Sequence, residues 1–260
     1  MLRNAFAVTL LFACSALAQS ADQGKSRPAA QNPCIQPAKM VPIEDYTGPF
    51  HRVVWWVTRK PEIQTVYHPS TPTGRICALA PRQKFRLFVR NTFEPVTLLT
   101  SAFDAGIAQA ADDDPSFGQG AEGYGKRLGA AALDRISSGF FHTFLFPVVF
   151  RQDPRYYRLG QGAGSARLGH ALAHVFVTHG DSGKTMFNFS EWMGAAATSA
   201  LSNTYHPGNR RGVGPASARV AISIGTDMAS DVVREFWPEI VRTFKLPFRA
   251  PQPQLKPDEK

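Results

Sequence analysis

Residues 215–245, PASARVAISIGTDMASDVVREFWPEIVRTFK, decide the fold class of this chain. Apolar side chains recur in this stretch at helical spacing, in the row Val220, Ile224, Met228, Val232 and Phe236. Beside it runs a row of small residues spaced four apart, Ser217, Ala221, Gly225 and Ala229. Glycine in a helix costs about 1 kcal/mol relative to alanine, and close contact with a neighbouring helix would offset that cost. The pattern therefore predicts one long helix, bent at Pro238, that packs on a second helix through its small residues.

The helical period continues through most of the chain before this stretch. It predicts helices over about residues 81–93, 96–111, 124–146, 166–178 and 188–203. Asn188 and Glu191 form a capping box at the start of the last of these. Between the helices, Asp153-Pro154 predicts a short helical turn, and residues 179–183 predict a loop.

Small residues also recur four apart on three of these earlier helices. The rows are Ala102, Gly106 and Ala110; Ala121, Gly125 and Gly129; and Trp192 followed by Ala196 and Ala200. Such rows let helix backbones approach one another closely. We therefore expect an all-α fold, a single bundle of five or six closely packed helices with interfaces rich in Gly and Ala.

Residues 1–18 have the three parts of a secretory signal peptide. Arg3 is the positive charge, residues 5–13 are the apolar run, and Ala16 and Ala18 are the small residues that signal peptidase reads. We predict an exported protein that is cleaved after residue 18. A lipid anchor on Cys14 is the alternative.

A proline-rich segment, residues 19–80, follows the signal peptide and is predicted to form an irregular arm. The helical domain then covers residues 81–246, and a polar tail over residues 247–260 is expected to be disordered. In an oxidising compartment we expect Cys34 and Cys77 to form a disulfide, which would stabilise the fold by about 3–4 kcal/mol. Two free thiols are the alternative.

Lysine and arginine outnumber aspartate and glutamate by 29 to 20, which gives a net charge of +9 and a pI near 9.7. The densest basic cluster, which also holds Tyr156 and Tyr157, consists of Arg151, Arg155, Arg158 and Arg167. Guanidinium groups bind phosphate and carboxylate in two-point geometry. Around an exported protein the polyanions are lipid headgroups or envelope glycans and not nucleic acid. The cluster therefore predicts an anion-binding face, with internal pairing to Asp153 or to residues 112–114 as the alternative.

Four residues are candidates for chemistry, namely His170, His174, Asp227 and Asp231. The two histidines lie four apart on one helix face, which suits a metal ion, but Ala171 stands where the zinc-protease motif has Glu. The two aspartates also share a face, and paired carboxylates perform acid–base catalysis when burial separates their pKa values. A hydrolase, with or without a metal, is therefore an alternative function. Packed histidines and a solvated carboxylate face are the structural alternatives, and no cofactor is predicted.

The longest strongly apolar stretch, residues 136–150, is about 15 residues long and falls short of the roughly 20 that cross a bilayer. Residues 215–245 carry several charges through their middle, each costly at the centre of a membrane. A membrane-embedded helical bundle is therefore a further alternative to a soluble or peripherally bound one.

Several short motifs occur in order along the chain. They are QGAEGYGKR (119–127), QDPRYYR (152–158), NFSE (188–191), SNTYHP (202–207) and EFWP (235–238). Through them, residues 85–240 resemble a group of uncharacterised exported bacterial proteins. The resemblance implies the periplasm or outer envelope of a bacterium and carries over no activity and no functional residue. We accordingly expect a non-enzymatic envelope protein that binds anionic lipid or glycan, or a protein partner, through a basic aromatic face.

Overall fold

The computed structural model describes residues 64–68, 76–206 and 211–244, which belong to one compact unit, Ile35–Lys260. The predicted signal peptide, most of the arm and the C-terminal tail lie outside the described residues. So do Cys14 and Cys34. Cys77 is described and is disulfide-bonded, and its pairing with Cys34 stays a prediction.

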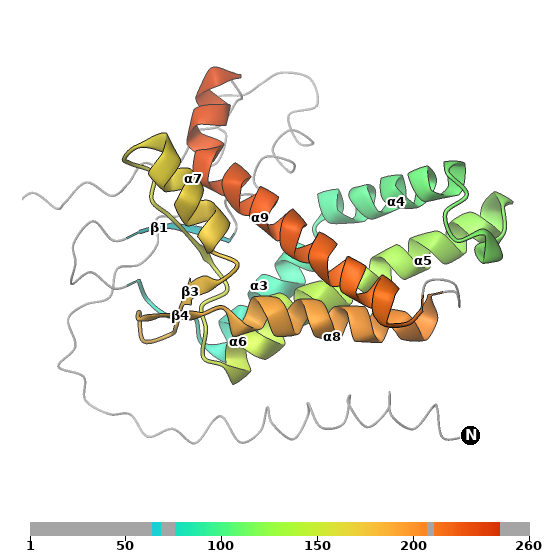
Figure 1. Cartoon of the computed structure of the whole chain (residues 1–260), viewed down its shortest axis with the longest axis horizontal. Coiled ribbons are helices and arrows are strands. Elements are labelled where there is room, and N and C mark those ends of the chain that lie inside the picture. Colours follow the sequence, from blue (N-terminus) through green and yellow to red (C-terminus); the bar gives the residue numbers. More distant parts are fainter. Residues whose placement is uncertain (1–63, 69–75, 207–210, 245–260) are drawn as a thin grey trace, which may run out of the picture. The chain divides into compact units, whose positions relative to one another are not determined.

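The described part of the chain is mostly helical, which confirms the predicted all-α class (Figure 1). In chain order its helices are α3 (Pro81–Thr92), α4 (Pro95–Ala110), the 3-10 turn η2 (Pro115–Phe117), α5 (Gly120–Gly139), the π-helix η3 (Phe140–Leu145), α6 (Phe146–Val149), α7 (Gly164–Ala173), α8 (Phe189–Tyr205) and α9 (Val213–Thr243). Its strands are β1 (Thr65–Tyr67), β2 (Tyr156–Arg158), β3 (Val177–His179) and β4 (Thr185–Phe187). No helix in these ranges combines the length and the apolar character of a bilayer span.

The four short strands correct two predictions. The segment after Asp153-Pro154 is not a helical turn but strand β2, which pairs in parallel with β1 so that Val66 lies opposite Tyr157. The predicted helix over residues 166–178 ends early, because its β-branched last residues enter β3. β3 and β4 form an antiparallel hairpin whose turn contains Gly183 at φ 81°, a conformation that suits glycine.

The apolar row predicted for α9 is the face that packs on its neighbours. Figure 1 shows α9 lying along α8, and α7 lies against its C-terminal half. Ile224 forms a buried cluster with Val175 and Ala195, and Val220 and Met228 pack against that cluster. Pro238 lies inside the helix as expected, and α9 changes direction toward its C-terminal end.

The rows of small residues do not form the interfaces that we expected from them. All four members of the α9 row are exposed, and a Cβ at Gly106, Gly125, Gly129 or Gly225 would meet nothing within 4 Å. Close approach occurs at other glycines. A Cβ at Gly139 would lie 2.6 Å from Thr92 Oγ1, and one at Gly194 would overlap the imidazole ring of His142.

A buried carboxylate ties α7 and β2 to α9. Glu235 of α9 is fully buried and accepts hydrogen bonds from Arg167 Nε (2.9 Å) and Tyr156 Oη (2.8 Å). It also accepts from the backbone nitrogens of Leu159 and Gly160. Because Arg167 belongs to α7, these bonds fix that helix against α9 and so set the position of its C-terminal end.

We predict that Arg167→Met destabilises the fold by about 3–5 kcal/mol, because it leaves the Glu235 charge buried without its cation. Arg242→Met, on the exposed end of the same α9 surface, is the control and should cost less than about 1 kcal/mol. Urea denaturation measures both. Addition of Glu235→Gln to Arg167→Met should recover part of the lost stability. Equal destabilisation by Arg167→Met and Arg242→Met would contradict the role of the Arg167–Glu235 ion pair.

Candidate functional site

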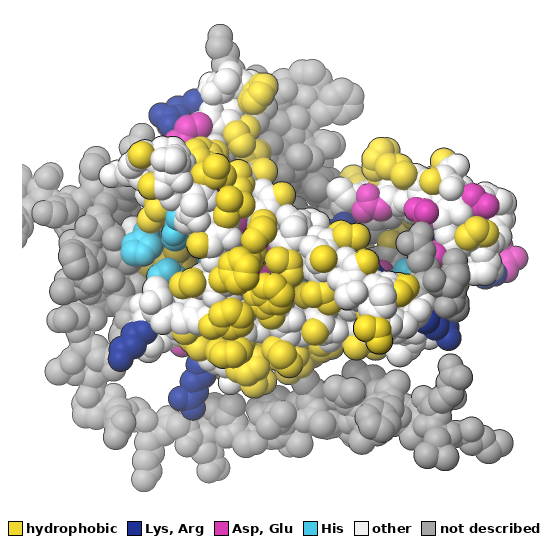
Figure 2. Space-filling view, viewed as in Figure 1, with side chains coloured by type: hydrophobic (Ala, Val, Ile, Leu, Met, Phe, Trp, Pro, Cys, Tyr) yellow, Lys and Arg dark blue, Asp and Glu magenta, His cyan; other side chains and the backbone are white. Residues whose placement is uncertain are grey.

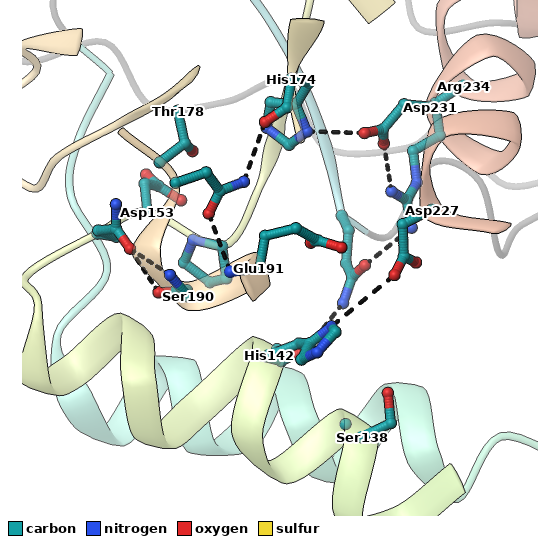
Figure 3. A pocket seen from close by; sticks show the side chains of 16 residues that line it. Ser138, His142, Asp153, His174, Thr178, Ser190, Glu191, Asp227, Asp231 and Arg234 are labelled. Atoms are coloured by element: carbon teal, nitrogen blue, oxygen red, sulfur yellow. Dashed lines mark hydrogen bonds and ion pairs between the residues drawn. The ribbon is translucent and has the colours of Figure 1, made fainter. Parts of the chain in front are cut away.

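A cavity of about 160 Å³ lies among η3, α8, α9 and the C-terminal end of α7 (Figure 3). Its walls are mainly polar, with imidazole, carboxyl, hydroxyl and amide groups. The lining residues used below are His142 of η3, Glu191 of α8, Asp227, Asp231 and Arg234 of α9, and His174. These residues come from four separate segments of the chain, which converge on one polar space.

His142 reaches the cavity from the π-helix. The wider turns of a π-helix interrupt the regular α-helical path, and they often occur at functional sites. The ring of His142 packs against α8 at Gly194, where only the missing Cβ leaves room for it. Its Nδ1 lies 3.9 Å from Asp227 Oδ2, and burial is the main reason that the pKa of His142 is lowered.

Glu191 stands in the first turn of α8. The side chain of Asn188 caps this helix by accepting a hydrogen bond from the backbone nitrogen of Glu191 (3.2 Å), as predicted. The Glu191 carboxyl group, however, lines the cavity (Figure 3), and its Oε1 is buried without a hydrogen-bond partner. Burial, together with the nearby charges of Asp227 and Asp231, raises the pKa of Glu191 well above its usual value.

His174, Asp231 and Arg234 form a hydrogen-bonded chain in the cavity wall. His174 Nδ1 lies 2.7 Å from Asp231 Oδ2, and the other oxygen of Asp231 accepts from Arg234 Nη1, also at 2.7 Å. Burial would raise the pKa of Asp231, but its bonds with His174 and Arg234 outweigh that effect and lower it. The second ring nitrogen of His174, Nε2, is buried and has no hydrogen-bond partner.

Three of the four residues predicted to carry chemistry therefore meet in this cavity. The exception is His170, whose Nε2 lies 2.7 Å from the carbonyl oxygen of Tyr157 and which does not line the cavity. The two histidines predicted to bind one metal ion thus have different partners, the carbonyl oxygen of Tyr157 for His170 and the carboxylate of Asp231 for His174. Donor atoms of His142, Glu191 and Asp227 lie within 4.8 Å of one another, and no other such group of three occurs in the described ranges.

The sequence prediction missed His142 and Glu191. His142 is the single histidine in residues 140–146, a run that is otherwise aromatic and aliphatic apart from Thr143, and that isolation is the available signal. The capping-box pattern predicts a capping role for Glu191, which describes its backbone correctly but not its side chain.

The predicted four-arginine face is not present. Arg155, Arg158 and Arg167 are buried, and only Arg151 is exposed. Arg155 pairs with Asp153 at 2.5 Å, which was the internal alternative, and Arg158 Nε donates to the carbonyl oxygen of Arg234. Because these guanidinium groups are buried inside the fold, they do not form a surface for an external anion.

Comparison with protein-family models, with curated proteins and with solved structures gives no match. The geometry of the cavity is therefore the basis for any assignment of function.

We predict that Gly194→Ala destabilises the protein by about 1–3 kcal/mol, since the new methyl group overlaps the His142 ring. The matched control is Gly225→Ala, in α9, where a Cβ meets nothing within 4 Å. That variant should stabilise by about 0.5–1 kcal/mol because alanine favours the helix. Urea midpoints measure both changes, and stabilisation by Gly194→Ala would contradict the packing of His142 described above.

Proposed function

We propose that this protein is a hydrolase that activates water in the cavity, with His174 as general base. The observation that carries the proposal is the His174–Asp231–Arg234 chain in a cavity wall, with His174 Nε2 left without a partner. A carboxylate can only accept, so in the neutral imidazole the contact at Nδ1 places the proton there and leaves Nε2 as an acceptor. Asp231 thereby orients the imidazole and would stabilise the cation that forms, as acidic partners of catalytic histidines do.

The reaction proceeds in two proton transfers. His174 Nε2 takes a proton from water while the water oxygen bonds to the carbonyl carbon of the substrate. The tetrahedral intermediate then expels its alcohol or amine, which takes that proton back from Nε2. The products are a carboxylic acid and the alcohol or amine, and the histidine returns to its neutral form.

The charges of the cavity favour a neutral substrate. Glu191, Asp227 and Asp231 bring carboxyl groups to its wall, and Arg234 is already bonded to Asp231. An anionic phosphoester would meet this carboxyl-rich lining at a cost, whereas a carboxylic ester or amide would not. The small volume accommodates the scissile end of such a substrate.

Replacement of His174 by Gln should lower kcat/KM for p-nitrophenyl acetate by about 10²–10⁴-fold, the usual contribution of a positioned general base. Asp231→Asn should also lower the rate, because it removes the charge that orients the imidazole. His170→Gln is the control, since His170 contacts a backbone carbonyl outside the cavity. Equal activity of the His174 and His170 variants, or no wild-type turnover of esters and amides, would contradict the proposal.

Binding to anionic lipid is the second candidate function, and a surface feature favours it. Hydrophobic side chains gather over much of the molecular face drawn in Figure 2. Exposed apolar residues of α7, β3, β4, α8 and the α7–β3 connection include Leu172, Phe176, Val177, Phe187, Phe189 and Met193. Aromatic and aliphatic side chains flanked by basic charge are typical of proteins that lie on a membrane surface.

The basic charge beside this apolar surface comes from Arg151 and Lys184. Both are exposed, and neither has an ion pair among the described residues. The two residues lie close together in the fold. Lys184 is in the turn of the β3–β4 hairpin, and the backbone nitrogen of Asp181, in the same turn, donates a hydrogen bond to the carbonyl oxygen of Arg151. This arrangement replaces the buried arginines of the predicted anion-binding face.

For the double variant Arg151→Glu/Lys184→Glu we expect affinity for vesicles of phosphatidylcholine and phosphatidylglycerol to fall at least about tenfold. The control Lys126→Glu/Arg135→Glu makes the same change of net charge at the α4–α5 end, where both side chains are partly exposed. Sedimentation with vesicles measures binding. Equal loss in both doubles would indicate net charge alone and would exclude a local lipid-binding surface.

A further inference from the structure

We propose that His142, Glu191 and Asp227 bind a divalent transition-metal ion. Its catalytic role rests on the proposed hydrolase function, since the ion would share the cavity with His174. The binding itself is argued from these three side chains and can be tested apart from any reaction.

The three side chains supply a suitable donor set. They come from η3, α8 and α9, and one nitrogen and two carboxylate oxygens lie within 4.8 Å of one another. In a tetrahedral site with bonds of about 2.1 Å, the donor atoms lie roughly 3.4 Å from one another. Small movements of the side chains would therefore complete the coordination.

The electrostatics of this corner also favour a cation. The Glu191 and Asp227 carboxyl groups face one another in a largely buried space, with Asp231 nearby. Arg234, the cation in the wall, is already bonded to Asp231 and to the side-chain oxygen of Gln64. The contact of Asp227 with His142 is long, at 3.9 Å, and a dication between Glu191 and Asp227 would compensate the negative charge of both carboxylates.

Glu191 adds an independent observation. Its Oε1 is buried and has no hydrogen-bond partner, which is unusual because buried polar atoms are normally satisfied. Contact with an ion accounts for such an atom.

The cluster around His206 is a useful contrast within the same chain. There the two ring nitrogens lie near different carboxylates, with Nδ1 3.5 Å from Asp114 and Nε2 2.9 Å from Asp134. His206 is thus a bridge between two ion-pair partners, whereas His142, Glu191 and Asp227 converge on one point.

The donor set points to a zinc- or manganese-type ion. Imidazole suits zinc and other first-row metals, while carboxylates suit harder ions such as manganese. Three protein ligands leave at least one position for water, which is the pattern of catalytic and not structural sites. When bound, the ion would lower the pKa of that water, and His174, which lines the same cavity, would take its proton.

The test is titration of the chelator-treated protein, without a polyhistidine tag, with Zn²⁺ by calorimetry and with Co²⁺ by visible absorption. We expect one equivalent to bind and to raise the melting temperature. Asp227→Asn and His142→Gln should weaken binding by about 100-fold or more. His206→Gln and His170→Gln are the matched controls and should bind as the wild type does.

Asp227→Asn keeps the test decisive if His142→Gln does not fold, because Asp227 is partly exposed and its amide preserves the shape. Absence of binding to the wild type, or undiminished binding to Asp227→Asn, would overturn the metal site. The two proposals can fail independently. Hydrolysis that depends on His174 but is unaffected by chelators would contradict the catalytic role of the metal and leave the hydrolase proposal intact. Metal binding without turnover of any ester or amide would contradict the hydrolase proposal and leave the metal site intact.

Discussion

The carboxylate of Glu235 is the constraint on which the arrangement of the site depends. It is buried completely, and its bonds to Arg167, Tyr156 and two backbone nitrogens join β2 and α7 to α9. A buried ion cannot lose one of its partners without a large free-energy cost. Since His174 follows the last residue of α7, and Asp231 precedes Glu235 by one helical turn, the same clamp holds the imidazole against its carboxylate.

The cavity differs from the buried ion pairs of Arg155 and Arg167 in how its charged groups are paired. Glu191 and Asp227 bring two carboxyl groups close together, and the buried Oε1 of Glu191 has no hydrogen-bond partner there. Burial of like charges destabilises a protein, and such departures from local consistency are expected at functional sites. Elsewhere, in contrast, the buried charges of Arg155 and Arg167 have close partners.

Sequence periodicity predicted the longer helices, since residues three and four apart share a face wherever the chain is helical, but it extended α7 too far. It could not show what each face meets. The row Ser217, Ala221, Gly225 and Ala229 is exposed, while the close contact is made by Gly194, which stands in no such row. Short strands such as β2 depend on a partner far along the chain, β1, and three residues carry too little pattern to reveal them.

The site was predictable only in part, for a related reason. Asp227, Asp231 and His174 stood out as titratable groups on helix faces, but their convergence with His142 and Glu191 is set by tertiary packing. The burial of the arginine cluster could not be predicted from the sequence for the same reason, because the carboxylate that pairs with Arg167 lies 68 residues away along the chain. The wide turn of η3 has one more consequence. Each residue of an α-helix rotates the chain by about 100°, so the π-helical segment shifts the phase of α6 relative to α5. Loss of Phe140 or Phe141 would restore a continuous α-helical register, and the imidazole of His142 would then point to a different side of the bundle.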